Sequence, residues 1–223
     1  MKNDSELQAD VLKSLKWEPI LNTAEIGVTT KDGLVSLTGI VDSYAKKLEA
    51  EKVAKSVIGV KVLLEKIEVK LPKSGIRNDA EITGEILIGL KSNWMIPEDK
   101  LTVKVDKGWV TLEGELPWDY QRVAAKNVVN YLKGILGVTN NIKIKSESQI
   151  TIDQKAIKDA IARSLSIKDN ETEVIVDGTT VTIRGTVNSW YQKEVIERIT
   201  WKTPGICNLK NELVVNYFYV LVV

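Results

Sequence analysis

The sequence predicts an α+β protein made of three tandem αββαβ domains, each with a three-stranded sheet packed against two helices. Internal repetition is the first observation behind this prediction. A shift of 75 positions places Leu7 on Ile82 and carries the Val-x-Leu-x-Gly motif ending at Gly39 onto the motif ending at Gly114. The second observation is a third copy, whose motif ends at Gly185. Repetition at this density indicates an array of similar units.

Each repeat begins with an amphipathic pattern. Leu7, Val11 and Leu15 recur at every fourth position, which places them on one stripe of a helix. Trp17 and Pro19 follow this stripe, and we expect the first helix to end there.

Two short strands follow the first helix. Ile26 and Val28 alternate with polar residues before an Asp32-Gly33 pair, and Val35 and Leu37 alternate after it. Alternating runs on either side of Asp-Gly are typical of a β-hairpin.

A second helix and a last strand complete each repeat. Asp42 or Ser43 is placed to accept a hydrogen bond from the free N–H groups at the helix start. Gly59 is expected to stop the helix, and Leu63 and Ile67 then alternate as a closing strand.

Six glycines recur at fixed places in the repeats. Three stand at the corner between the second strand and the second helix, and three follow that helix 20 positions later: Gly39, Gly114 and Gly185, then Gly59, Gly134 and Gly205. We interpret both sets as structural, because a corner or a helix C-terminus needs room or a positive φ. The alternative is that a ligand approaches the backbone at the corner glycines.

Short polar linkers separate the repeats, so we expect domains that fold autonomously but stay close together. The predicted boundaries are residues 1–72, 76–146 and 150–216 for the three domains and 217–223 for an apolar C-terminal extension.

Composition excludes several classes of function. The chain has 31 Lys and Arg against 30 Asp and Glu, a net charge of +1, no histidine and a single cysteine, Cys207. A near-neutral chain has no field to attract nucleic acid. Without histidine and with one cysteine, it lacks the usual general base, a disulfide and a cysteine-rich zinc site. We therefore expect no enzyme activity, no cofactor, no metal and no nucleic-acid partner.

The chain shows no stretch long enough to cross a membrane. Its most apolar segment, Leu213 to Val223, is about half of the ~20 residues that a transmembrane helix needs. The polar N-terminus does not have the basic start and apolar run of a secretory signal. We expect a cytoplasmic protein.

Aromatic residues gather near the ends of the predicted helices. They are candidates for an interface with a lipid headgroup zone or a partner: Trp17, Tyr44, Trp94, Trp118, Tyr120, Trp190 and Tyr191. Amphipathic rings suit such a zone. The alternative interpretation is that the rings cover each small core or hold neighbouring repeats together. Aromatic platforms for single-stranded nucleic acid accompany a basic groove, which this charge balance does not provide.

The repeats resemble the BON domain, the bacterial module named for osmotically inducible and nodulation proteins. The resemblance rests on Val-x-Leu-x-Gly before the second helix, Gly-Val or Gly-Ile after it, and an asparagine in the closing strand at Asn140 and Asn211. Repeat one departs from this pattern with Glu65. The order of the whole chain is similar to that of cytoplasmic triple-BON proteins without a lipoprotein anchor.

The resemblance implies a non-enzymatic protein linked to osmotic or envelope stress. Family members are associated with phospholipid surfaces, and one cytoplasmic relative with potassium. The leading hypothesis is therefore a stress-associated binding or scaffolding protein that contacts phospholipid surfaces or envelope-associated partners. One alternative is a small-ligand or potassium-ion sensor, with loop oxygens near Asp32, Asp106 and Asp177. Another is a structural or chaperone-like oligomer.

The C-terminal extension predicts self-association. Its apolar residues would cover both faces of a strand; the main ones are Tyr217, Phe218, Tyr219 and Leu221. An uncovered strand of this kind promotes aggregation, so we expect it to be covered, either by a neighbouring repeat or, as the favoured hypothesis, by a second copy of the chain through strand addition.

Deleting residues 217–223 should therefore leave the three domains folded and reduce self-association. Sedimentation at several concentrations, with circular dichroism of both proteins, measures this. A full-length chain that stays monomeric at high concentration would contradict the prediction.

Overall fold

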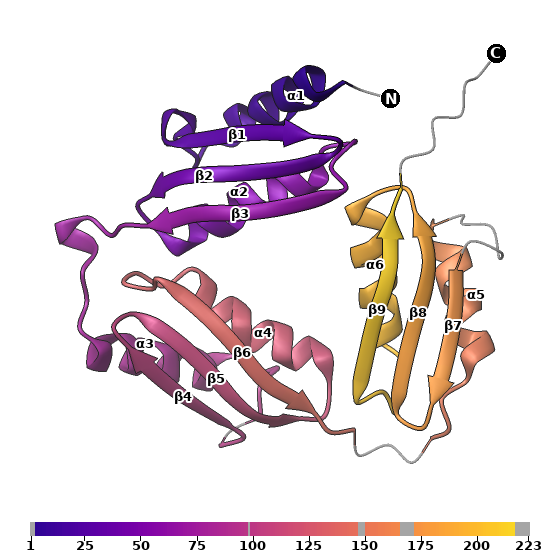
Figure 1. Ribbon diagram of the computed structural model, residues 1–223. Coiled ribbons are helices and arrows are strands. Elements are labelled where there is room, and N and C mark those ends of the chain that lie inside the picture. The colour runs from indigo at the N-terminus through magenta and orange to yellow at the C-terminus, as the bar shows by residue number, and fades with distance from the viewer. Residues whose placement is uncertain (1–2, 98, 147–149, 166–171, 217–223) are drawn as a thin grey trace.

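The structure is a computed structural model that describes residues 3–97, 99–146, 150–165 and 172–216. It contains three units of similar shape that follow one another along the chain (Figure 1). The predictions for the extension, residues 217–223, lie outside the described residues.

Each unit has the predicted order of helix, two strands, helix and strand. The elements of domain 1 are α1 (Asp4–Trp17), β1 (Ile26–Lys31), β2 (Leu34–Val41), α2 (Tyr44–Ser56) and β3 (Val62–Val69). Those of domain 2 are α3 (Asp79–Ser92), β4 (Leu101–Asp106), β5 (Trp109–Leu116), α4 (Asp119–Asn130) and β6 (Gly137–Ile144). Those of domain 3 are α5 (Gln154–Leu165), β7 (Thr172–Asp177), β8 (Thr180–Val187), α6 (Trp190–Trp201) and β9 (Asn208–Val215). Short 3₁₀ turns, η1 (Thr23–Glu25) and η2 (Lys73–Gly75), precede β1 and α3. The predicted fold class is confirmed.

Each sheet combines a hairpin with a parallel crossover. In domain 1, β1 pairs antiparallel with β2, and β3 lies parallel on the other side of β2. Parallel neighbours need a long connection, and α2 provides it. Domains 2 and 3 repeat this order.

The helix starts are fixed by local hydrogen bonds. Asn3 and Glu6 form a reciprocal capping box at α1, and Asn78 and Glu81 form the same box at α3. Of the two predicted caps of α2, the structure uses Ser43, whose side chain accepts from the Lys46 N–H. These caps set where each helix begins and therefore which residues face the core.

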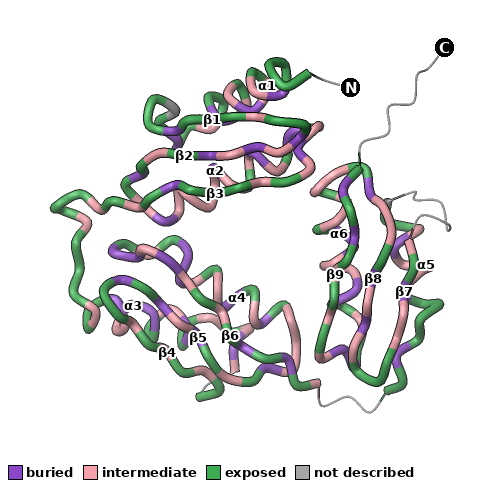
Figure 2. Tube along the Cα trace, viewed as in Figure 1, coloured by how far each residue is buried: buried purple, intermediate pink, exposed green. Residues whose placement is uncertain are grey.

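The cores lie between the sheets and their helices, as the buried segments in Figure 2 show. In domain 1, the predicted stripe of Leu7, Val11 and Leu15 packs with Val35 and Leu37 of β2, and all five side chains are buried. The alternating pattern of β2 therefore puts one face on the core.

The glycines after the second helices do not cap them. The C-cap residues are Val57, Tyr131 and Lys202, so Gly59, for example, lies two residues past the C-cap of its helix. Gly59 has φ 113° in the turn toward β3, a conformation that favours glycine. It turns the chain, whereas the C-cap itself needs no glycine.

The glycines predicted at the corner between strand and helix lie instead within the second strands, Gly39 in β2 and Gly114 in β5, and they meet a tighter constraint there. Gly114 has φ 139°, and a Cβ built on it would lie 2.2 Å from the carbonyl oxygen of Lys100. Gly39 has φ 136°, with Glu25 in the equivalent place. A side chain at this strand position collides with the backbone of the residue just before the neighbouring first strand.

Gly114→Val should destabilise the protein by about 2–4 kcal/mol, because the new side chain needs both a strained φ and a displaced strand. The matched control is Gly84→Ala in α3, where a Cβ meets nothing within 4 Å. That change should stabilise by up to about 1 kcal/mol through helix propensity. Thermal denaturation measures both, and equal midpoints for Gly114→Val and the parent would contradict the steric argument.

Candidate functional site

The second helices bring the three domains together. In Figure 1, one end of α6 lies toward domain 1 and the other toward α4 of domain 2. The first residues of α2, α4 and α6 occupy corresponding positions in the repeats: Tyr44, Asp119 and Trp190. Each of the three lies beside the next domain, and together they define the junctions described below.

Tyr44 joins domain 1 to domain 2. Its side chain is only 8% exposed and packs with the buried residues of domains 2 and 3. Burial raises the pKa of the Tyr44 hydroxyl, whereas a hydrogen bond with the backbone of Val138 in β6 lowers it. Leu48 and Val69 of domain 1 pack on the same cluster. Tyr44 is thus part of a domain contact.

Trp190 joins domain 3 to domain 1. Its ring packs against the domain 1 core, and the Lys55 ammonium of α2 lies 5.3 Å from the ring centroid. The Lys193 ammonium lies 5.5 Å from the same centroid, and burial lowers the pKa of Lys193. The indole Nε1 is buried without a hydrogen-bond partner. Packing and cation–π attraction therefore hold the Trp190 ring.

Domain 2 contacts domain 3 through Arg122 of α4. The Arg122 guanidinium lies 4.6 Å from the ring centroid of Trp201 and forms an ion pair with Asp119. Burial raises the pKa of Asp119, Arg122 opposes that rise, and Glu197 of α6 adds to it. The contact of Arg122 with Trp201 thus brings the start of α4 close to the end of α6.

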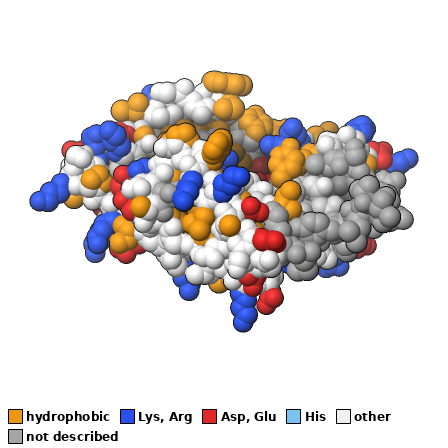
Figure 3. Space-filling model, turned by 90° about the horizontal axis from the view of Figure 1, so that it is seen from above, with side chains coloured by type: hydrophobic (Ala, Val, Ile, Leu, Met, Phe, Trp, Pro, Cys, Tyr) orange, Lys and Arg blue, Asp and Glu red, His pale blue; other side chains and the backbone are white. Residues whose placement is uncertain are grey.

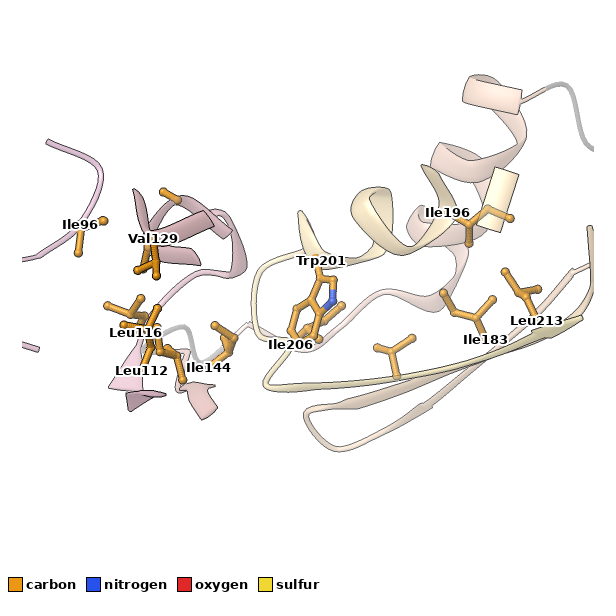
Figure 4. Close-up of a cluster of buried hydrophobic side chains, with 14 of the residues drawn as sticks. Ile96, Leu112, Leu116, Val129, Ile144, Ile183, Ile196, Trp201, Ile206 and Leu213 are labelled. Atoms are coloured by element: carbon orange, nitrogen blue, oxygen red, sulfur yellow. The ribbon is translucent and has the colours of Figure 1, made fainter. Parts of the chain in front are cut away.

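The cores of domains 2 and 3 are also continuous. Ile144 at the end of β6 belongs to the same buried cluster as Trp201 and Ile206 of domain 3 (Figure 4). Ile152, just after the segment that joins the domains, is buried in this cluster as well. The contact is therefore apolar packing as well as charge.

The three contacts close a cycle. Tyr44 of domain 1 packs on domain 2, the Asp119–Arg122 pair reaches domain 3, and Trp190 of domain 3 packs on domain 1. Tyr44 and Trp190, each the first residue of its helix, make two of the contacts, whereas Arg122, the fourth residue of α4, makes the third. This arrangement fits the interpretation in which aromatic rings hold neighbouring repeats together.

The other predicted interface aromatics are more accessible. Trp17 at the end of α1 is 84% exposed, and Trp94 just after α3 is 90% exposed. Tyr120 and Tyr191 are exposed near the starts of α4 and α6. Trp118 is half-buried and stacks on Tyr120, with ring centroids 6.4 Å apart.

The sequence interpretation missed three aromatic residues. Trp109 and Tyr131 are exposed, and Trp201 forms part of a junction. Trp201 stands four residues before Gly205, as Lys55 stands before Gly59. Lys55 and Trp201 thus occupy the same position in their repeats and both lie at a junction, and this correspondence could have indicated the role of Trp201.

A recurring hydrogen bond explains the asparagine of the closing strands. Asn140 and Asn211 each accept the backbone N–H two residues later, at 3.2 and 3.3 Å. Glu65 in repeat one accepts the Ile67 N–H in the same way. Glu65 also pairs with Lys47 at 2.9 Å. Although repeat one has Glu65 in place of the asparagine, it therefore keeps the same local hydrogen bond.

No cation site emerges from the residues that the structure describes, among which no three His, Cys, Asp or Glu side chains are grouped to hold a metal. The loop acids Asp32, Asp106 and Asp177 lie in three different domains. The backbone N–H of Asp32 donates to the Asp4 carboxylate at 2.9 Å. The potassium hypothesis thus gains no support from these loops.

Within the described ranges, no helix has the length and apolar character to cross a bilayer.

Trp190→Ala should loosen the contact between domains 1 and 3, costing about 1–3 kcal/mol of interface stability and increasing the radius of gyration. Small-angle scattering and thermal denaturation measure these effects. Tyr191→Ala, at the neighbouring exposed residue, is the control and should change neither. Equal radii of gyration for Trp190→Ala and Tyr191→Ala would contradict this role of the Trp190 ring.

Comparisons with known proteins agree with the repeat structure. A model of the BON domain matches residues 3–70, 78–146 and 151–217. Osmotically-inducible protein Y of Escherichia coli (strain K12) is 31% identical over 147 residues, which cover 64% of this chain and 73% of that protein.

Two solved structures of CdsD, a structural protein of the Type III secretion system of Chlamydia trachomatis, are also similar. One is 15% identical with a TM-score of 0.25 and covers 94% of this chain and 92% of its own. The other, its C-terminal domain, is 18% identical with a TM-score of 0.25 and covers 96% and 100%. The family match spans all three repeats and confirms the predicted resemblance: this chain belongs to the BON-domain family.

Proposed function

We propose that this chain is a non-enzymatic, osmotic-stress-associated binding and scaffolding protein that contacts phospholipid surfaces through exposed indole rings. Its BON domains and its similarity to an osmotically inducible protein support the link to osmotic stress. The junctions between the domains support the scaffolding part, because they hold several binding units in one arrangement.

The exposure of Trp17 and Trp94 carries the proposal. Trp17 is the last residue of α1 and Trp94 lies just after α3, and both are almost fully exposed. An indole combines a large apolar body with an N–H group, which suits the boundary between lipid and water. Because the rings belong to different domains, they can act as two linked anchors, and linked anchors bind more tightly than either alone.

Electrostatics contributes little to this binding. The net charge is +1, and basic and acidic side chains are interspersed on the face shown in Figure 3. Anionic lipid therefore attracts the protein weakly from a distance, and the affinity should depend only slightly on salt. Insertion of the rings has to supply most of the binding energy.

Trp17→Ala with Trp94→Ala should weaken binding to phosphatidylcholine–phosphatidylglycerol vesicles by about 100-fold, which is about ten-fold for each ring. Burying about 60 Å² of each ring at about 25 cal/mol per Å² contributes about 1.5 kcal/mol, or roughly ten-fold in affinity. Co-sedimentation with vesicles measures the loss.

The matched control is Tyr131→Ala, which removes another exposed ring at the end of α4. Its vesicle binding should equal that of the parent. If the parent does not sediment with any vesicle, or if the tryptophan variant binds as the parent does, the lipid proposal is wrong. The cytoplasmic location and the envelope-associated partner remain predictions.

A further inference from the structure

A cleft lies where the start of α4 meets the end of α6. Its volume is about 580 Å³, within the range that small organic ligands occupy. Domain 2 lines one side with Trp118, Asp119, Tyr120 and Val123, and domain 3 lines the other with Arg198, Trp201 and Lys202. A ligand here would touch two domains at once.

Aromatic rings form the walls of this cleft. Trp118 and Tyr120 stack with an angle of 27° between their planes. The Trp201 ring, 9% exposed, stands on the other side and is held by the Arg122 guanidinium. Rings fixed in this way offer faces and edges to a further planar group.

The charges that face the cleft are not balanced. Asp119 is paired with Arg122, and the Glu197 carboxylate, which keeps its charge and accepts a hydrogen bond from Asn211 at 2.9 Å, does not line the cleft. Arg198 and Lys202 are exposed, and neither forms an ion pair within the described part of the chain. The cleft therefore has two available cations at its domain 3 side.

The other two junctions show why this one is open. Tyr44 and Trp190 each place a ring against the neighbouring domain. The corresponding residue of domain 2 is Asp119, whose side chain is shorter and has no ring. The unfilled space coincides with the one junction that lacks an aromatic residue at this position.

We propose that the cleft between α4 and α6 binds a small organic anion with a planar aromatic group, such as an aryl carboxylate. The aromatic group of the ligand stacks between the Tyr120 ring and the Trp201 ring, and its carboxylate pairs with Arg198 and Lys202. Bound in this way, the ligand occupies the place that Tyr44 and Trp190 fill at the other junctions and stabilises the contact between domains 2 and 3. This site is separate from Trp17 and Trp94 and does not depend on the lipid proposal.

Calorimetric titration with 2-naphthoate tests the site, with the neutral 2-naphthylmethanol as the comparison ligand. We expect saturable binding of one naphthoate and binding of the alcohol at least about ten-fold weaker. Arg198→Ala with Lys202→Ala should weaken naphthoate binding by about ten-fold or more. The matched control is Lys52→Ala, at the position of α2 that corresponds to Arg198, and it should leave binding unchanged.

Two further variants test the walls of the cleft. Asp119→Tyr introduces the residue found at the start of α2 and should abolish binding by filling the space. Tyr120→Ala removes an exposed ring, which leaves the buried cores intact, and should weaken binding by about five-fold or more. Circular dichroism verifies that each variant is folded. Naphthoate affinity that is unmeasurable in the parent, or equal in the parent, the double-alanine variant and Tyr120→Ala, would overturn the proposal.

Discussion

The packing of the first turn of each second helix onto a neighbouring domain is the interaction on which the arrangement of this protein depends. One BON domain buries a modest core, and these contacts extend that core across domain boundaries. Tyr44 and Trp190 make the contact with aromatic rings, whereas domain 2 makes it with the Asp119–Arg122 pair against Trp201. Because the last contact returns from domain 3 to domain 1, the chain forms a closed cycle in which each domain is held by two others.

The aromatic residues fall into two groups, those that form the domain contacts and those that face solvent. The rings at the starts of α2 and α6 are committed to domain contacts, which leaves Trp17 and Trp94 as large rings facing solvent. The difference among the junctions has a second consequence. Where Asp119 replaces a ring, the cycle stays closed through Arg122, but a cleft remains beside the contact. The outer rings and the cleft are separate surfaces, and each is available for a partner of different chemistry.

The repeat, the element order and the positions that need glycine could be predicted from the sequence because each depends on local periodicity or on one backbone conformation. The stripe of Leu7, Val11 and Leu15 and the need for glycine at position 114 are examples. The domain junctions could not be predicted in the same way. Whether Tyr44 faces a lipid or another domain depends on contacts between residues far apart in the chain, and the role of Trp201 depends on Arg122, 79 positions earlier. The C-cap positions could not be predicted from the sequence pattern either, because Gly59 marks the turn after the helix, two residues past the cap at Val57.

The central claim is that the three BON domains form one rigid arrangement through the junctions of α2, α4 and α6. Backbone N–H residual dipolar couplings of the full chain in a weakly aligning medium test it directly. The account predicts that a single alignment tensor fits the couplings of all three domains in the orientations of this structure. Domains that require separate tensors of different magnitude would show that they move independently and would contradict it.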